Sequence, residues 1–350
     1  MGVATSGPQL KTNNWRAARL FVDTGSQWVG RDQFGTDNNL YSFSKTDSTD
    51  KTVHLNLAGL AADNAGTALT TPVAESINVM GDGNWLICVR DNSTAKYYLH
   101  KSIDGGLTIG DNAPLYNNGR AVLHIGEHAG THAPLIGLLI DRGICELGGV
   151  YYLADYNVNT ARTPGGASDW IQIKKSVDAG TTWTTEFVQN TGGSNLWRHF
   201  HCLVAEPETG LIYIGFGDGG ADSGTIVWNP SVGGWQANNV NLSVIDTWAG
   251  FNCMGADLDP QAKYNATDFI PLPNSEWCVH VTDGFSERGI HRFKKANPAA
   301  TFELVLDFDA MGLDTRLCSY GVRFADGTLC VTNFLDGNDV SPSYHFDMYT

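Results

Sequence analysis

The stretch KSVDAGTTW, residues 175–183, carries the pattern S-x-D-x-G-x-T-W, and a near copy, KSIDGGLTIG, occupies residues 101–110. An aspartate in such a turn accepts hydrogen bonds from backbone N–H groups of its own turn, and the glycine adopts a conformation that other residues avoid. Strand-like runs flank both copies, so the pattern predicts a hairpin between antiparallel strands. We therefore expect Asp104 and Asp178 to stabilise turns and not to contact a ligand.

A second feature also repeats: a short apolar run that ends in aspartate. Examples are WLICVRD, residues 85–91, and EWCVHVTD, residues 276–283. The runs end at Asp32, Asp91, Asp155, Asp218, Asp283 and Asp336. Their spacing of roughly 60 residues is typical of a repeated structural unit.

Each unit begins with a short apolar run, which a glycine-containing turn connects to the Asp-ended run. A third and a fourth strand-like run follow. Alternating β-branched and aromatic residues between glycine-rich turns indicate antiparallel strands. Four-stranded units repeated around a ring form a β-propeller. The sequence predicts an all-β fold: a six-bladed β-propeller of four-stranded antiparallel blades, built as a single domain from residues 1–350.

The last unit contains only three runs before the sequence ends at Thr350. A missing outer strand would leave a row of unpaired N–H and C=O groups, which proteins usually cover. The segment upstream of Trp15 has no place in the first unit. We therefore expect residues 1–14 to supply the outer strand of the last blade.

The S-x-D-x-G-x-T-W pattern resembles the Asp-box, or BNR repeat, of sialidase-like propellers. NNWRAARLFVDTGSQWVGRD, residues 13–32, is similar to the first sialidase blade, in which an arginine binds the substrate carboxylate. CSYGVRFADGTLCVTNF, residues 318–334, is similar to the last sialidase blade, which carries a tyrosine nucleophile. The resemblance implies a propeller fold, with Arg16 as a carboxylate-binding residue and Tyr320 as the nucleophile.

Propeller geometry predicts which end of each blade carries the chemistry. The first strand lines the channel and the second returns beside it, so the start of the first and the end of the second lie on one face. The box turns, which join strands three and four, lie on the opposite face. Counting back from the turns places these polar residues at the mouth of the channel: Arg16, Glu75, Arg142, His199, His201, Asn252, Ser319 and Tyr320.

This set of residue types favours recognition and cleavage of an acidic glycan. Arginine binds carboxylates with two parallel hydrogen bonds, and aromatic rings stack on sugars. The predicted substrate-binding residues are Arg16, Arg142, Arg198, Asn252 and Trp248. Glu75, His199 or His201 would act as the base and Tyr320 as nucleophile or proton donor. Either hydrolysis, as in a sialidase-like glycosidase, or β-elimination, as in a polysaccharide lyase, fits the pattern.

Histidines suggest a divalent metal as an alternative use of the same region. His199 and His201 alternate and so share one side of an extended strand. HIGEHAGTHAP, residues 124–134, adds further histidines and a glutamate, although its glycine and proline disfavour a helix. A metal site and a structural role for the histidines both remain open at this point.

Composition limits the other classes of function. The net charge of −15 disfavours non-specific binding to nucleic acid. No apolar stretch is long enough for a membrane-spanning helix, and the N-terminus lacks the apolar core of a secretory signal. The seven cysteines occur singly within apolar runs, which predicts buried free thiols and folding in a reducing compartment.

The main alternative is a propeller that binds without catalysis. A glycan- or protein-binding module of a viral tail or adhesin would also be made in the cytoplasm without a signal peptide and assembled into a particle. An assembly role is a third option. The sequence does not fix the oligomeric state.

Overall fold

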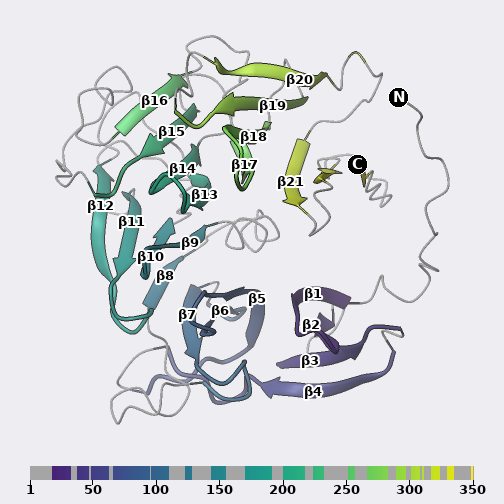
Figure 1. The fold of residues 1–350 in the computed structure, drawn as a ribbon. Helices are drawn as coiled ribbons and strands as arrows, with labels where there is room; N and C mark the ends of the chain where they lie inside the picture. The colour runs from purple at the N-terminus through teal and green to yellow at the C-terminus, as the bar shows by residue number, and fades with distance from the viewer. Residues whose placement is uncertain are drawn as a thin grey trace. The chain divides into compact units, whose positions relative to one another are not determined.

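A computed structural model gives the fold of the chain (Figure 1). The structure describes residues 18–32, 38–46, 49–62, 66–94, 96–109, 123–127, 143–154, 170–190, 200–216, 224–231, 251–256, 266–282, 289–296, 301–307, 310, 317–323, 329–334 and 348–349. The chain divides into two compact units, Met1–Glu127 and His128–Thr350. Each unit is described by itself.

The N-terminal unit contains two four-stranded antiparallel sheets, each with its strands in chain order. The first sheet consists of β1 (Ala18–Asp23), β2 (Gln27–Asp32), β3 (Asn39–Ser44) and β4 (Lys51–Asn56). The second consists of β5 (Pro72–Val79), β6 (Trp85–Asp91), β7 (Lys96–Ser102) and β8 (Leu123–Glu127). Strands β1 and β5 adjoin, and Val29 and Leu40 share one apolar core with Ile87 and Val89.

The C-terminal unit contains three four-stranded sheets and one three-stranded sheet among its described residues. Their strands are β9 (Ile144–Leu147), β10 (Val150–Ala154), β11 (Trp170–Ser176) and β12 (Thr184–Asn190); β13 (Phe200–Glu206), β14 (Leu211–Phe216), β15 (Gly224–Trp228) and β16 (Phe251–Ala256); β17 (Ala266–Pro271), β18 (Trp277–Thr282), β19 (Gly289–Lys294) and β20 (Glu303–Asp307); and β21 (Leu317–Arg323), β22 (Leu329–Phe334) and β23 (Met348–Tyr349).

The sheets of the C-terminal unit meet through their first strands. Strand β13 adjoins both β9 and β17, and β17 adjoins β21 (Figure 1). Aromatic side chains fill the space between the sheets. Trp228 meets Tyr152 edge to face with ring centroids 5.2 Å apart, and Tyr213 packs against Phe269 and Phe293. Neighbouring sheets of this unit are therefore held together by aromatic packing, in addition to the hydrogen bonds within each sheet.

The structure confirms the all-β class and the place of the Asp-ended runs. Each run forms the second strand of a sheet: β2, β6, β10, β14, β18 and β22 end at, or one or two residues before, the aspartates at which the runs end. Within the described part of the chain no residue lies in an α-helix, and no helix there could cross a membrane.

Both box turns lie where the pattern predicts, between the third and fourth strands. The first follows β7 and precedes β8, and the second joins β11 to β12. Asp178 accepts hydrogen bonds from the Thr182 backbone and hydroxyl at 2.8 and 2.6 Å and from Ser176 at 2.7 Å. Asp104 accepts the equivalent bonds in the first turn. The two turns are thus built from the same hydrogen bonds.

The first box turn also attaches the two N-terminal sheets to each other. His54 of β4 stacks on Trp85, with ring centroids 5.7 Å apart, and its Nε2 donates to the Gly105 carbonyl at 3.0 Å. Gly106, with a φ of +80°, passes so close to Trp85 that an added Cβ would lie 2.6 Å from the indole. This turn therefore requires glycine for two reasons, its backbone conformation and its contact with the ring.

One sequence-based strand assignment is wrong. We expected Asn252 to begin the first strand of the fifth repeat, but the structure places it in β16, the fourth strand of the preceding sheet. The first strand of the next sheet is β17, ATDFIP. Its aspartate and proline are unusual in a strand, so FNCMGA gave the stronger strand pattern.

The described cysteines agree with the sequence-based expectation. Cys88, Cys202 and Cys278 are buried and Cys145 is partly buried, all four as free thiols. Burial raises the pKa of Cys278 well above its ordinary value, and the negative charge of Glu206 adds to this effect. The Cys278 thiol therefore stays protonated and packs as a small apolar side chain.

Candidate functional site

β-Bulges interrupt five first strands in the described part of the chain. In each, one residue interrupts the register with the second strand. The extra residues are Phe21, Glu75, His201, Thr267 and Ser319. A bulge redirects side chains and is frequent beside active sites. In β13, β17 and β21 of the C-terminal unit the bulge lies within the first three residues, which marks this end of their sheets as a candidate site.

The register of the second sheet shows that its box turn lies at the other end. Pro72, at the start of β5, pairs with Asp91, whereas Val79, at the end of β5, pairs with Trp85. Trp85 in turn pairs with Ser102, where the box turn begins. Glu75 lies in the half of β5 nearer Pro72, whereas the box turn lies at the end of the sheet that carries Trp85.

Glu75 pairs with Arg31, a residue that sequence reasoning missed. The Arg31 Nη2 lies 3.2 Å from the Glu75 Oε2, with 20% and 7% of the two side chains exposed. The pair links β2 to β5 in the N-terminal unit. A guanidinium has five N–H donors in a fixed planar geometry that matches a carboxylate.

His201 is the bulge residue of β13, and its side chain is almost fully buried. Its Nδ1 lies 3.1 Å from the carbonyl oxygen of Ala266 in the neighbouring β17. A carbonyl only accepts hydrogen bonds, so Nδ1 must carry the proton. In the neutral ring, Nε2 then holds the lone pair, which is the arrangement of a general base or a metal ligand.

Thr267 and Asp268 form the equivalent bulge on β17 beside His201. The Thr267 hydroxyl donates to the Val281 carbonyl at 3.3 Å, and the Asp268 carboxylate accepts from the Phe269 N–H at 2.8 Å. Both side chains are buried. These bonds fix the backbone around Ala266, the residue whose carbonyl holds the imidazole.

The remaining predicted site residues are described in part or not at all. Tyr320 lies in β21 directly after the bulge residue Ser319, where its backbone pairs with Thr332. Asn252 lies in β16. The residues that fall outside the described ranges are Arg16, Arg142, Arg198, His199 and Trp248. Their predicted roles stay predictions.

The metal hypothesis also rests largely on undescribed residues. In the first histidine region, only His201 lies within the described ranges. In the second, the structure describes the backbone of His124 and Glu127 in β8. Among described residues, no group of three or more His, Cys, Asp or Glu side chains could hold a metal ion. A metal site that uses His199 or the 128–134 region stays a prediction.

The signal for Arg31 was present in the sequence but ambiguous. It stands directly before the aspartate that ends the second strand, as does Arg90 in the next sheet. Alternation along β2 predicts a side-chain direction only when the register is known, and the bulge at Phe21 changes that register. The partner of Arg31, 44 residues away in sequence, follows only from the packing of two sheets.

Comparisons with known proteins give a likeness of fold. No protein-family model matches the sequence, and no curated protein matches it. A structure from a study of two prolyl endopeptidases has a TM-score of 0.50 at 12% identity, over 91% of this chain and 40% of that chain. A puromycin-hydrolysing peptidase of Mycobacterium tuberculosis has a TM-score of 0.49 at 11% identity, over 95% and 45%. An ancestral GH74 enzyme has 0.47 at 12%, over 95% and 38%.

The chain spans less than half the length of each of these three proteins. At such low identity, the likeness to the prolyl endopeptidase, an enzyme of the β-propeller type, concerns the fold alone. It agrees with the antiparallel sheets and adjoining first strands described above. The activity must be argued from the residues themselves.

Proposed function

We propose that the chain forms one six-bladed β-propeller that binds an acidic glycan and cleaves it. The six consecutive antiparallel sheets of the described residues support the blade count. The two box turns, with matching hydrogen bonds, support the resemblance to sialidase-like propellers. We place the catalytic site in the C-terminal unit, at the end of its sheets where the bulged first strands β13, β17 and β21 begin.

The observation that carries the proposal is the geometry of His201. A buried imidazole held through Nδ1 by a backbone carbonyl is fixed in orientation and tautomer, and its Nε2 can take a proton. We assign His201 of β13 as the general base and Tyr320 of β21 as nucleophile or proton donor.

Recognition of the acidic sugar is assigned to arginine. Arg31 lies one residue before the end of β2, and its guanidinium pairs with Glu75. Preorganised arginines bind carboxylates with geometric selectivity. Arg31 therefore joins the predicted arginines Arg16, Arg142 and Arg198 as a candidate for binding the carboxylate.

Two reactions fit this assignment and differ in their products. Hydrolysis consumes one water and leaves a new reducing end. β-Elimination from a uronic acid removes the proton at C5, expels the 4-linked sugar, and leaves an unsaturated uronate together with a new reducing end. In the first reaction His201 would accept a proton from Tyr320 or water; in the second it would accept the C5 proton.

A panel of sialylated and uronic-acid oligosaccharides tests the proposal. Reducing ends and ultraviolet absorbance by unsaturated uronates are measured after incubation with the full chain, in parallel with calorimetric binding. New reducing ends without absorbance identify a hydrolase, and both signals together identify a lyase. Binding without either product would replace the proposal with the non-catalytic glycan-binding alternative, and absence of binding would remove the glycan function altogether.

A further inference from the structure

Three groups converge on the backbone carbonyl of Ala266 in β17. The His201 Nδ1 lies 3.1 Å from its oxygen and the Cys202 Sγ lies 3.9 Å from it. The third is Gly215 of β14, which pairs with Cys202 directly beside the bulge at His201. The Ala266 carbonyl of β17 thus contacts the bulge of β13 in the neighbouring sheet.

Gly215 leaves the space that this carbonyl occupies. A Cβ added at Gly215 would lie 2.3 Å from the Ala266 oxygen, 3.0 Å from the Ala266 carbonyl carbon and 2.9 Å from the Cys202 Sγ. Two of these atoms belong to the backbone of a strand in another sheet, so a rotamer change cannot relieve the contact. Any side chain at this position must push β17 away from β14.

We propose that Gly215 is a positioning residue for the imidazole of His201. Its missing side chain lets the Ala266 carbonyl approach the bulge, and the carbonyl then selects the Nδ1–H tautomer and directs Nε2 as the basic nitrogen. The catalytic consequence rests on the proposed function, whereas the tautomer itself does not. The two can therefore fail separately.

The tautomer of His201 is measured directly by nitrogen NMR on histidine-labelled full-length protein. The resonances of His201 are assigned by their loss in His201→Asn, and the measurement needs no substrate. In the wild type we expect a protonated Nδ1 and an unprotonated Nε2 above neutral pH. A wild-type His201 with the proton on Nε2 would overturn the proposal at once.

The glycine is tested by Gly215→Ala, with Gly210→Ala as the matched control. Gly210 lies in the turn between the same two strands, has a φ of +71° and has open space around its Cβ position. Its substitution costs stability through the backbone without touching Ala266. We expect Gly215→Ala to lower the ratio of Nδ1–H to Nε2–H forms roughly fivefold, the factor that corresponds to one neutral hydrogen bond, and Gly210→Ala to leave it unchanged.

An unchanged ratio in Gly215→Ala would show that the glycine does not position the ring. If Gly215→Ala does not fold, the double variant Cys202→Ala/Gly215→Ala removes the sulfur contact and keeps the carbonyl contact, and the wild-type tautomer remains decisive. If the tautomer shifts as expected but no acidic glycan is cleaved by the wild type, the positioning role stands and the proposed activity does not.

Discussion

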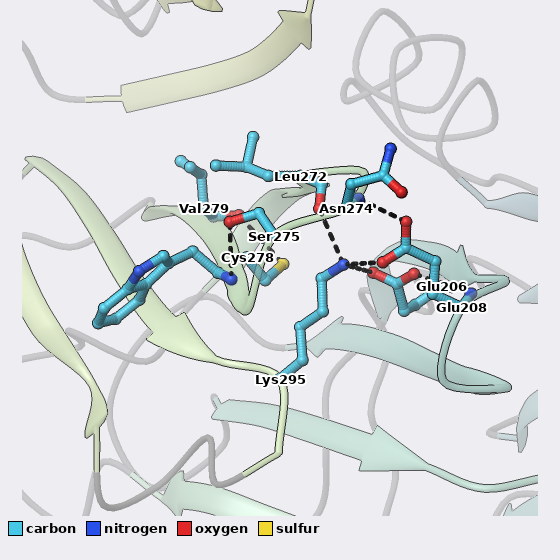
Figure 2. A network of polar contacts seen from close by, with 9 residues as sticks. Glu206, Glu208, Leu272, Asn274, Ser275, Cys278, Val279 and Lys295 are labelled. Carbon is cyan, nitrogen blue, oxygen red and sulfur yellow. Dashed lines mark hydrogen bonds and ion pairs between the residues drawn. The ribbon is translucent and has the colours of Figure 1, made fainter.

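The ammonium group of Lys295 lies 2.9 Å from the carboxylate of Glu206, although the two residues come from neighbouring sheets and only 5% and 2% of their side chains are exposed. Figure 2 shows Lys295 reaching between Glu206, Glu208 and the Leu272 carbonyl, which it meets at 2.9 Å in each case. Burial alone lowers the pKa of Lys295, but the hydrogen bonds to both glutamates outweigh it and raise the pKa above its ordinary value. The Lys295 ammonium therefore stays protonated through neutral pH.

We expect Lys295→Met to lower the free energy of unfolding by about 3–5 kcal/mol, because it leaves the buried Glu206 carboxylate without its cation. Lys294→Met is the control: the adjacent Lys294 pairs with Glu276 at 2.9 Å, but 39% and 58% of these side chains are exposed. An exposed pair contributes at most about 1 kcal/mol. Urea unfolding compares the two variants, and equal losses would contradict a bridging role for Lys295.

The box turns give a prediction about acid stability. Burial alone would raise the pKa of Asp178, but hydrogen bonds from Thr182 and Ser176 outweigh it and lower the pKa below its ordinary value. A lowered carboxyl pKa stabilises the fold above the unfolded value of about 3.9, and this stabilisation disappears as the pH falls toward the folded value. The equivalent hydrogen bonds in the first box turn lower the pKa of Asp104 in the same way.

Asp178→Ala should therefore cost roughly 1–3 kcal/mol near neutral pH through lost turn bonds, with the difference from the wild type narrowing below about pH 4. The glycan affinity of the folded variant should not change. Val177→Ala, at an exposed neighbouring position, is the control for altering this loop. Thermal unfolding across a pH series measures the effect; a constant difference at all pH values would contradict the ionic role of Asp178.

Arg31→Lys tests recognition of the sugar carboxylate. Lysine keeps the charge but cannot make two parallel hydrogen bonds, so affinity for an acidic oligosaccharide should fall roughly tenfold or more. Arg292→Lys changes an exposed arginine paired with Glu303 and should leave affinity unchanged. Calorimetric titration measures the affinity of both variants for the acidic oligosaccharide. The titration is repeated with a sugar whose carboxylate has been reduced to an uncharged alcohol. If the two variants bind equally well, Arg31 has no part in recognition.

The outer edge of the last sheet leads to a prediction about residues 1–14, which lie outside the described ranges. If this segment pairs beside β23, deleting residues 1–12 should lower the melting temperature and cause concentration-dependent aggregation through the exposed edge. Differential scanning calorimetry and light scattering report the two effects. An unchanged melting temperature would mean that the edge is covered in another way.

Local patterns predicted much of this fold. The box turns and the Asp-ended second strands depend on neighbouring residues, such as Asp178 and Thr182, and could be located from the sequence. The bulges could not, because one extra residue in a first strand becomes visible only in its register with the second strand. Glu75 and His201 were selected for their position near a strand start, whereas Arg31 and Gly215 owe their places to contacts with another sheet. Asn252 was misplaced because β17 carries a buried aspartate that weakens its strand pattern.

The central claim is that the Nε2 of His201 acts in catalysis, and one comparison tests it most directly. His201→Asn keeps a donor in the place of Nδ1 for the Ala266 carbonyl but removes Nε2. His280→Gln changes another buried histidine of the same unit, which contacts Thr225 through Nε2 at 3.2 Å, and keeps a polar group in that place. On the glycan that the wild type cleaves, we expect kcat to fall about 10²–10⁴-fold in His201→Asn at nearly unchanged melting temperature, and to change little in His280→Gln. A folded His201→Asn variant with wild-type kcat would contradict the account.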